Sequence, residues 1–259
     1  MSLSVIILLI CSGIFVGVVN TFAGAAAAVS ISVYTALGLP IGIANGTNRL
    51  PVLFQVGAAA FNFRKQHLLD FSVGLKLGIP TALGALIGAE FAAKVNPSLF
   101  VMLLSTILIL LLALLLFSPN RILKGNGKPP RDVKKLDCFW FFLVGLYGGA
   151  FQIGMGYVIM GLTIMGMGYD VIRANALKSF IVMIYIPCTL AVFMYHGQVA
   201  YAYGFVHAIG NVIGAYVASK YATRINTQFL RWMLIVFIAL TVLDLLKIIS
   251  IKNALDNIL

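Results

Sequence analysis

The segment GALIGAEFAAKVN at Gly84–Asn96 recurs 130 positions later as GAYVASKYATRIN at Gly214–Asn226. The same offset holds without gaps back to Ala44, and it places Phe63 over Phe193. A match of this length is not an effect of composition, so the sequence predicts an internal duplication. Repeats of this kind are the usual construction of secondary transporters, whose sites lie near mid-membrane where the repeats meet.

The composition indicates that most of the surface faces lipid. Of the 259 residues, 61% are hydrophobic and only 10% are charged, and the mean hydropathy is +1.04. Soluble domains carry about 25% charged residues. We therefore predict an all-α, polytopic membrane protein. The first apolar run lacks a basic leader, which favours a first membrane helix over a cleaved signal peptide.

Apolar runs long enough to cross about 30 Å of hydrocarbon recur along the whole chain. They lie at Leu3–Thr21, Ile43–Phe63, Leu69–Ala93, Ser98–Phe117, Leu136–Gln152, Val171–Tyr195, Val199–Lys220 and Thr227–Ile249. Two shorter apolar pieces, Ala25–Leu37 and Met155–Met167, each follow a break of small residues. Each is expected to be a broken or re-entrant helix, or else a segment whose small residues pack tightly against a neighbour.

The charges predict how the chain is divided and oriented. A dense basic cluster lies in the connector between the apolar runs, and it consists of Arg121, Lys124, Lys128, Arg131, Lys134 and Lys135. We therefore assign 1–117 to a first transmembrane repeat, 118–136 to a basic cytoplasmic linker and 137–259 to a second repeat, with about five hydrophobic segments in each. A basic loop between apolar spans follows the positive-inside rule, so nucleic acid is not expected as a partner. We favour an inverted duplication with both termini outside, although Lys247 and Lys252 argue against that placement.

Two related polar clusters are the strongest candidates for chemistry. The sequence ANGTNR at Ala44–Arg49 falls on ANALKS at Ala174–Ser179, so Asn45 matches Asn175, and Arg49 lies one aligned position from Lys178. A charge inside an apolar helix costs several kcal/mol unless a cavity, a partner or a bound ion compensates it. No acid in either helix is spaced to do so, whereas an anionic substrate would.

The predicted anion site has eight members, which are polar residues of these clusters and of the second small-residue break. They are Asn45, Thr47, Asn48, Arg49, Gln152, Asn175, Lys178 and Ser179. Amide groups donate hydrogen bonds and arginine can clamp an oxyanion with two of them. The alternative is that Arg49 and Lys178 extend to the lipid headgroups. Gln152 could donate to a ligand or cap a helix end.

Three further positions are candidates for coupling or for lining the pathway. Glu90 could carry a coupling proton, but Lys94 four residues later makes a surface pair at the helix end the favoured alternative. Lys76 and His207 fall one position apart under the repeat, and His207 could equally be a packing residue. No Ser-His-Asp, HExxH, P-loop or paired-carboxylate pattern occurs, and the three cysteines have no metal-ligand spacing. We predict no catalysis, no metal and no cofactor.

The chain resembles the sulfite exporter TauE/SafE family, also called the toluene sulfonate uptake permease family, over nearly its whole length. The resemblance rests on GVVNTFAGAAAAVSISVYTALGLPIGIANGTN (Gly17–Asn48), on ALGALIGAEFAAKV (Ala82–Val95) and on a weaker copy, GLYGGAFQIGMGYVIMGLTIMGMGYDVIRANALKS (Gly145–Ser179). The family's Gly-rich stretch reads AGAAAA here, which leaves less room for a ligand to approach the backbone.

Membership implies transport of sulfite, sulfonates or related small oxyanions across the bacterial cytoplasmic membrane, commonly export, with protons as the coupling ion. The prediction is thus a secondary transporter that works by alternating access around a site between the repeats. A channel-like anion conduit and a non-transporting membrane anchor or assembly subunit stay open as alternatives. The sequence does not decide the exact substrate or whether the chain forms a homo-oligomer.

Overall fold

The computed structural model describes residues 1–23, 26–117, 129–221, 235–236, 239 and 242–243. Every regular element among them is helical: α1 (Leu3–Ala23), α2 (Ala27–Ala36), α3 (Ile41–Lys65), α4 (Phe71–Lys94), α5 (Pro97–Phe117), α7 (Lys135–Ala150), α8 (Met155–Gly161), the π-helical turn η1 (Leu162–Gly166), α9 (Val171–Tyr195) and α10 (Tyr201–Lys220). The predicted helical class is therefore confirmed, and the last predicted span, Thr227–Ile249, lies almost wholly outside the described residues.

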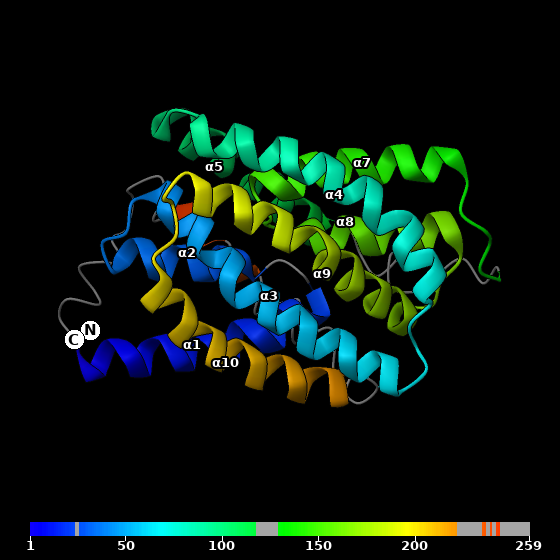
Figure 1. Ribbon diagram of the computed structural model, residues 1–259, viewed down its shortest axis with the longest axis horizontal. Coiled ribbons are helices and arrows are strands. Elements are labelled where there is room, and N and C mark those ends of the chain that lie inside the picture. The colour runs from blue at the N-terminus through cyan, green and yellow to red at the C-terminus, as the bar shows by residue number, and fades with distance from the viewer. Residues whose placement is uncertain (24–25, 118–128, 222–234, 237–238, 240–241, 244–259) are drawn as a thin grey trace.

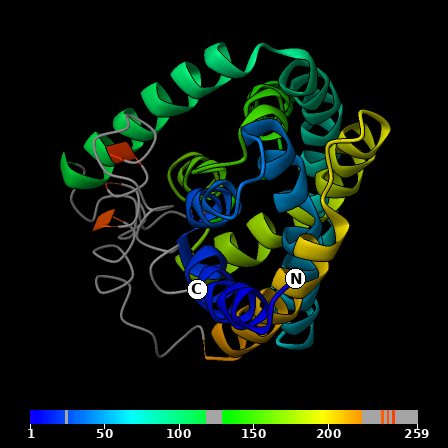
Figure 2. The same ribbon diagram turned by 90° about the vertical axis from the view of Figure 1, so that its left-hand side faces the viewer.

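Helices α3 and α9 form the centre of the bundle. They pack against each other and run in opposite directions (Figure 1). Each is 25 residues long, and their ends differ by the sequence offset of 130. Around them, α4 packs on α7 and α9, whereas α10 packs on α1 and α3. Viewed along the bundle, α5 lies at its outer edge (Figure 2).

Local chemistry sets where the helices begin. Asp70 accepts a hydrogen bond from the backbone N of Val73 at 3.1 Å, and Asp170 accepts from the backbone N of Ile172 and Arg173, both at 3.0 Å. Such N-caps satisfy backbone donors that the first turn leaves unpaired. The Asp70 cap starts α4 two residues after the predicted Leu69, and α7 already begins inside the predicted linker, at Lys135.

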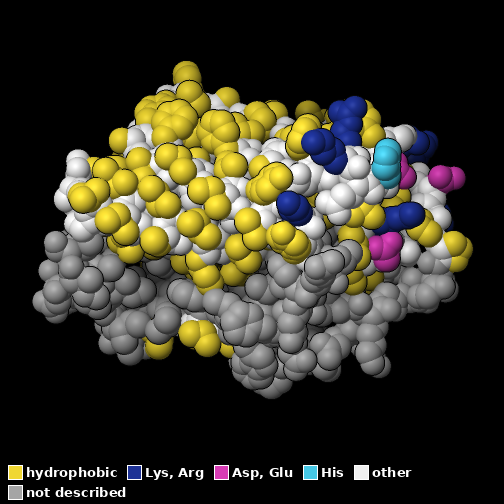
Figure 3. Space-filling model, turned by 90° about the horizontal axis from the view of Figure 1, so that it is seen from below, with side chains coloured by type: hydrophobic (Ala, Val, Ile, Leu, Met, Phe, Trp, Pro, Cys, Tyr) yellow, Lys and Arg dark blue, Asp and Glu magenta, His cyan; other side chains and the backbone are white. Residues whose placement is uncertain are grey.

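The surface of the bundle matches a protein embedded in lipid. Three helices among the described residues are long and apolar enough to cross a membrane: Leu3–Thr21, Phe71–Lys94 and Val171–Tyr195. Large apolar side chains are exposed at regular helical spacing, as at Ile79, Leu83 and Ile87 of α4. In Figure 3 apolar side chains cover most of the coloured face, while charged ones gather at one end.

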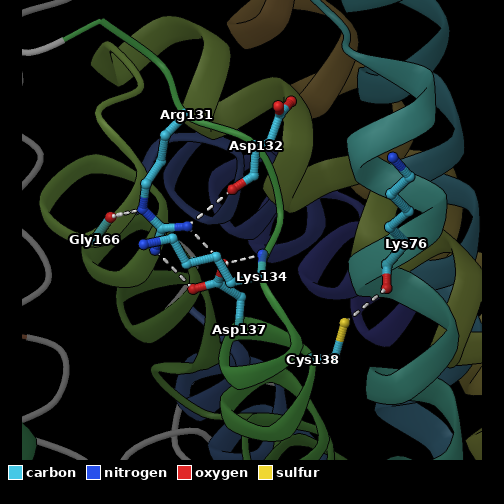
Figure 4. A network of polar contacts seen from close by, with 7 residues as sticks. All are labelled: Lys76, Arg131, Asp132, Lys134, Asp137, Cys138 and Gly166. Carbon is cyan, nitrogen blue, oxygen red and sulfur yellow. Dashed lines mark hydrogen bonds and ion pairs between the residues drawn. The ribbon is translucent and has the colours of Figure 1, made fainter.

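At the charged end, Arg131 ties the segment before α7 to the end of η1 (Figure 4). Its guanidinium donates to both carboxylate oxygens of Asp137, at 2.7 and 2.8 Å, and its Nε donates to the carbonyl of Gly166 at 2.8 Å. Nearby, Tyr169 donates to Asp70 at 3.2 Å. Burial, and secondarily the Asp70 carboxylate, raise the pKa of Tyr169 to about 12, so the phenol keeps the proton that it donates.

Glycines allow the outer helices to approach the bundle closely. A Cβ on Gly84 of α4 would collide with the carbonyl oxygen of Phe142 in α7, and one on Gly214 of α10 would collide with that of Ile14 in α1. Small residues at such contacts let helix backbones meet, which is a main source of packing energy in membranes. These two glycines occupy the same position under the offset of 130.

Gly84→Ala is expected to destabilise the protein by about 1–3 kcal/mol, because the two backbones must separate to admit the methyl group. The matched control is Gly57→Ala in α3, where a Cβ would meet nothing within 4 Å. There, alanine should be neutral or slightly stabilising. We expect the apparent melting temperature in detergent to fall by about 3–10 °C for Gly84→Ala alone. Equal melting temperatures for both variants would contradict the close packing of α4 on α7.

Candidate functional site

The two predicted polar clusters meet inside the bundle. The first half of α3 buries Asn45, Thr47, Asn48 and Arg49, and the facing part of α9 buries Asn175, Lys178 and Ser179. The exposed fraction is 0% for Arg49 and 4% for Lys178. Side chains that reach headgroups along a helix surface would be exposed, so this burial speaks against the headgroup alternative.

Arg49 is hydrogen-bonded to the C-terminal end of α7. Its Nη1 donates to the carbonyl of Gly148 and its Nη2 to that of Gly149, both at 2.8 Å. Asn45, one turn earlier in α3, donates to the carbonyl of Ala150 at 3.0 Å. The last carbonyls of a helix lack partners within the helix and carry its partial negative charge, so they compensate a buried cation.

Lys178 makes the corresponding contact with the end of α1. Its Nζ donates to the carbonyl of Asn20 at 3.1 Å and to that of Thr21 at 2.6 Å, and α1 ends at Ala23. Each central helix therefore carries a cation that holds the C-terminus of the first helix of the other predicted repeat. An ammonium group has three donors, so one N–H of Lys178 stays available after these two bonds.

A small cavity lies beside Lys178, where α2 and α8 begin. It measures about 30 Å³, which is room for about two water molecules. The described residues that line it are Asn20, Thr21, Ala27, Val52, Gln55, Val56, Gln152, Met155, Gly156, Lys178, Ser179, Val182 and Tyr185. Three members of the predicted site, Gln152, Lys178 and Ser179, thus share one cavity.

Hydrogen-bond donors without a protein partner point to the cavity as a ligand site. Gln55 uses its Oε1 to accept from Asn20 at 3.1 Å, and Gln152 uses its Oε1 to accept from Asn48 at 3.0 Å. Within the described part of the chain, the Nε2 groups of both glutamines and the hydroxyl of Tyr185 have no hydrogen-bond partner. All three side chains are at least 95% buried. Buried polar groups are normally paired, so these donors are available to a ligand.

The backbone around Gln152 is shaped for this position. Gln152 has a φ of 62° and Gly154 a φ of 72°. A side-chain-bearing residue is uncommon in the left-handed region, and such residues cluster at functional sites. The tight turn ends α7 at Ala150, two residues before the predicted end of the span, and starts α8 at Met155. This turn places Gln152 in the wall of the cavity beside Lys178.

Thr47 and Asn175, the remaining predicted residues, lie outside this cavity. Thr47 accepts from the backbone N of Ala200 at 2.8 Å, and the Oδ1 of Asn175 is buried without a partner among the described residues. Sequence reasoning missed Asn20, Gln55 and Tyr185 as cavity residues. A usable signal existed, because Gln55 and Tyr185 occupy the same position under the offset of 130.

The three coupling or pathway candidates do not line this cavity. Glu90 lies at a partly exposed helix end, where it pairs with Lys94 at 2.6 Å and with His196 at 3.0 Å. Lys76 is exposed on α4. His207 is fully buried in α10, with its Nδ1 2.7 Å from the hydroxyl of Tyr34. The ion pair of Glu90 with Lys94 is the one that the sequence favoured over a role of Glu90 in proton coupling.

Comparison with known proteins identifies the family. The family model described as "Sulfite exporter TauE/SafE" matches residues 9–245. The chain belongs to the sulfite exporter TauE/SafE family. This TauE/SafE chain is 26% identical, over 85% of its length and 84% of the relative's, to a probable membrane transporter protein, ORF9, of a Sinorhizobium species. It is 22% identical, over 88% of its length and 89% of the relative's, to a probable membrane transporter protein of Haemophilus influenzae. No solved structure is a significant match.

Family membership and the apolar helices together establish the broad class. The TauE/SafE chain is an integral membrane protein and a membrane transporter. The two relatives are named as probable membrane transporter proteins, and the family is a transporter family, not an enzyme family. The resemblance read from the sequence motifs is therefore confirmed at the level of the family.

Proposed function

We propose that this protein is a secondary transporter that exports a small oxyanion, such as sulfite or an organosulfonate, from the bacterial cytoplasm. The observation that carries the proposal is the small cavity between α3 and α9, whose lining includes four side chains with hydrogen-bond donors, those of Lys178, Gln55, Gln152 and Tyr185. A desolvated anion needs both a compensating charge and several donors. This set supplies both.

The eight predicted site residues divide into two roles in this proposal. Lys178, Gln152 and Ser179 contact the anion, because they line the cavity. Asn48 orients Gln152 through the 3.0 Å bond to its Oε1, which leaves the Nε2 facing the ligand. Arg49 and Asn45 hold the end of α7, from which the chain turns to Gln152. Thr47 holds the segment before α10 by accepting from the backbone N of Ala200, and the backbone carbonyl of Asn175 accepts from Ser179 at 2.9 Å.

Two inverted repeats and alternating access complete the proposal. The repeats are supported by the ends of α3 and α9, which match under the offset of 130, and by the opposite directions of these two helices. They are also supported by equivalent packing, because α4 packs on α7 in the same way that its counterpart α10 packs on α1. A cavity of about 30 Å³ is too small for a sulfonate. Substrate therefore enters when the repeats rock apart, and the charged end, rich in Lys and Arg, faces the cytoplasm.

The test is transport by the purified protein in proteoliposomes. We expect flux of radiolabelled sulfite or methanesulfonate that saturates with concentration and is inhibited by excess unlabelled anion. Flux that rises linearly without saturation would favour a channel-like conduit, and flux equal to that of protein-free vesicles would favour an anchor or assembly subunit. An imposed pH gradient, inside acidic or inside alkaline, reveals whether protons drive the movement and in which direction.

A further inference from the structure

We propose that the cavity selects anions of a single negative charge, and that Gln55 and Tyr185 are the specificity-determining residues beside Lys178. This inference rests on the proposed function and deepens it, because it names the charge class of the cargo. It follows from the number of cations that reach the cavity and from the kinds of donor around them.

The wall of the cavity is built from equivalent positions of the two central helices. Val52 of α3 and Val182 of α9 differ by 130 positions, and so do Gln55 and Tyr185. All four line the cavity. At the polar pair, α3 contributes an amide and α9 a phenol. Both groups donate hydrogen bonds without carrying charge, so each can coordinate an anion oxygen without adding to the positive charge.

Lys178 is the one charged side chain among the described residues that line the cavity. The other buried cation, Arg49, directs both terminal nitrogens of its guanidinium at the carbonyls of α7 and does not line this space. Part of the charge of Lys178 is in turn compensated by the carbonyls of Asn20 and Thr21. A monoanion balances what remains, whereas a dianion would leave an uncompensated charge buried, at a large cost.

The rest of the wall fits a small apolar group attached to the anion. Val52, Val56 and Val182 border the donors, together with Ala27 and Met155. These side chains offer no hydrogen bonds to further oxygens. Once the repeats have moved apart to admit it, an anion with charge on one side and a methyl or short alkyl group on the other therefore matches the lining of the cavity better than a fully polar ion such as sulfate.

Competition for labelled methanesulfonate binding to the purified protein in detergent tests the charge preference. Unlabelled methanesulfonate should compete at least tenfold more strongly than sulfate or 1,2-ethanedisulfonate, which both carry two charges. Tyr185→Phe should weaken methanesulfonate binding by about tenfold with an unchanged melting temperature, because the lost hydroxyl has no protein partner among the described residues.

Gln55→Lys gives the sharper test, because it adds a second positive charge to the wall. We expect the affinity ratio of 1,2-ethanedisulfonate to methanesulfonate to rise at least tenfold. Gln66→Lys, at the exposed end of α3, adds the same charge to the protein outside the cavity and should leave the ratio unchanged. An equal shift in both variants would overturn the inference.

The outcomes separate this inference from the proposed function. The charge selection alone is overturned if transport is saturable but dianions compete as strongly as monoanions do. It is also overturned if Gln55→Lys leaves the affinity ratio of 1,2-ethanedisulfonate to methanesulfonate unchanged. Absence of binding and of transport for every anion overturns the proposed function together with it. Selective binding of monoanions, with the expected response to Gln55→Lys and Tyr185→Phe, supports both.

Discussion

Lys178→Met is expected to lower the rate of saturable anion transport in proteoliposomes more than 100-fold. Methionine is an unbranched side chain only one atom shorter than lysine, and the substitution removes the charge that lines the cavity. A 100-fold effect corresponds to about 2.7 kcal/mol. That is the scale of losing one charge-assisted hydrogen bond to the anion, and the uncompensated buried charge adds to it.

The matched control for this prediction is Lys94→Met in α4. Lys94 is exposed, pairs with Glu90 and lies outside the cavity, so transport should stay within about twofold of the unmodified protein. Lys178→Arg, which retains the charge, should recover part of the activity. A Lys178→Met protein that folds and transports at half the normal rate would remove the basis for the site. The melting temperature measured alongside identifies any loss that comes from unfolding.

Arg49→Met is expected to act first on stability, with a loss of about 3 kcal/mol or more. The carbonyls of Gly148, Gly149 and Ala150 would keep at most the Asn45 amide as a partner, and each buried acceptor left unpaired costs about 1–3 kcal/mol. The apparent melting temperature in detergent should fall by about 6–12 °C. Transport should fall as well, because the end of α7 positions Gln152.

Arg64→Met, at the exposed end of the same helix, is the control and should change the melting temperature by no more than about 2 °C. Arg49→Lys keeps the charge but cannot direct two parallel donors at two carbonyls, so an intermediate loss is expected. If Arg49→Met melted at the normal temperature and yet failed to bind methanesulfonate, Arg49 would be an anion ligand rather than a clamp on α7.

The two cations show where sequence reasoning reached its limit. The depth of Arg49 and Lys178 in the apolar runs of related helices favoured their burial over extension to the lipid headgroups. The sequence did not reveal the partners of these two cations, because a search for compensating acids considers only side chains. The actual acceptors are backbone carbonyls at the ends of α7 and α1, which every residue possesses and no sequence pattern marks.

Gln55 and Tyr185 illustrate a second limit. Repeat alignment emphasised identical or similar residues, such as Asn45 with Asn175, and gave no weight to an amide aligned with a phenol. The two side chains are equivalent only as hydrogen-bond donors in a shared cavity. That equivalence appears once α3 and α9 are packed against each other.

The sequence by itself determined the helical class and the family, and it placed most helix limits to within two residues. It gave the full extent of Val171–Tyr195, because membrane thickness demands long apolar runs that few other folds need. It also favoured burial of the two related polar clusters around Arg49 and Lys178, but it did not single out the buried Gln55. Only the tertiary structure decided which helix ends compensate Arg49 and Lys178 and which side chains face the cavity. These depend on contacts between residues about 100–160 positions apart, which local patterns along the chain do not encode.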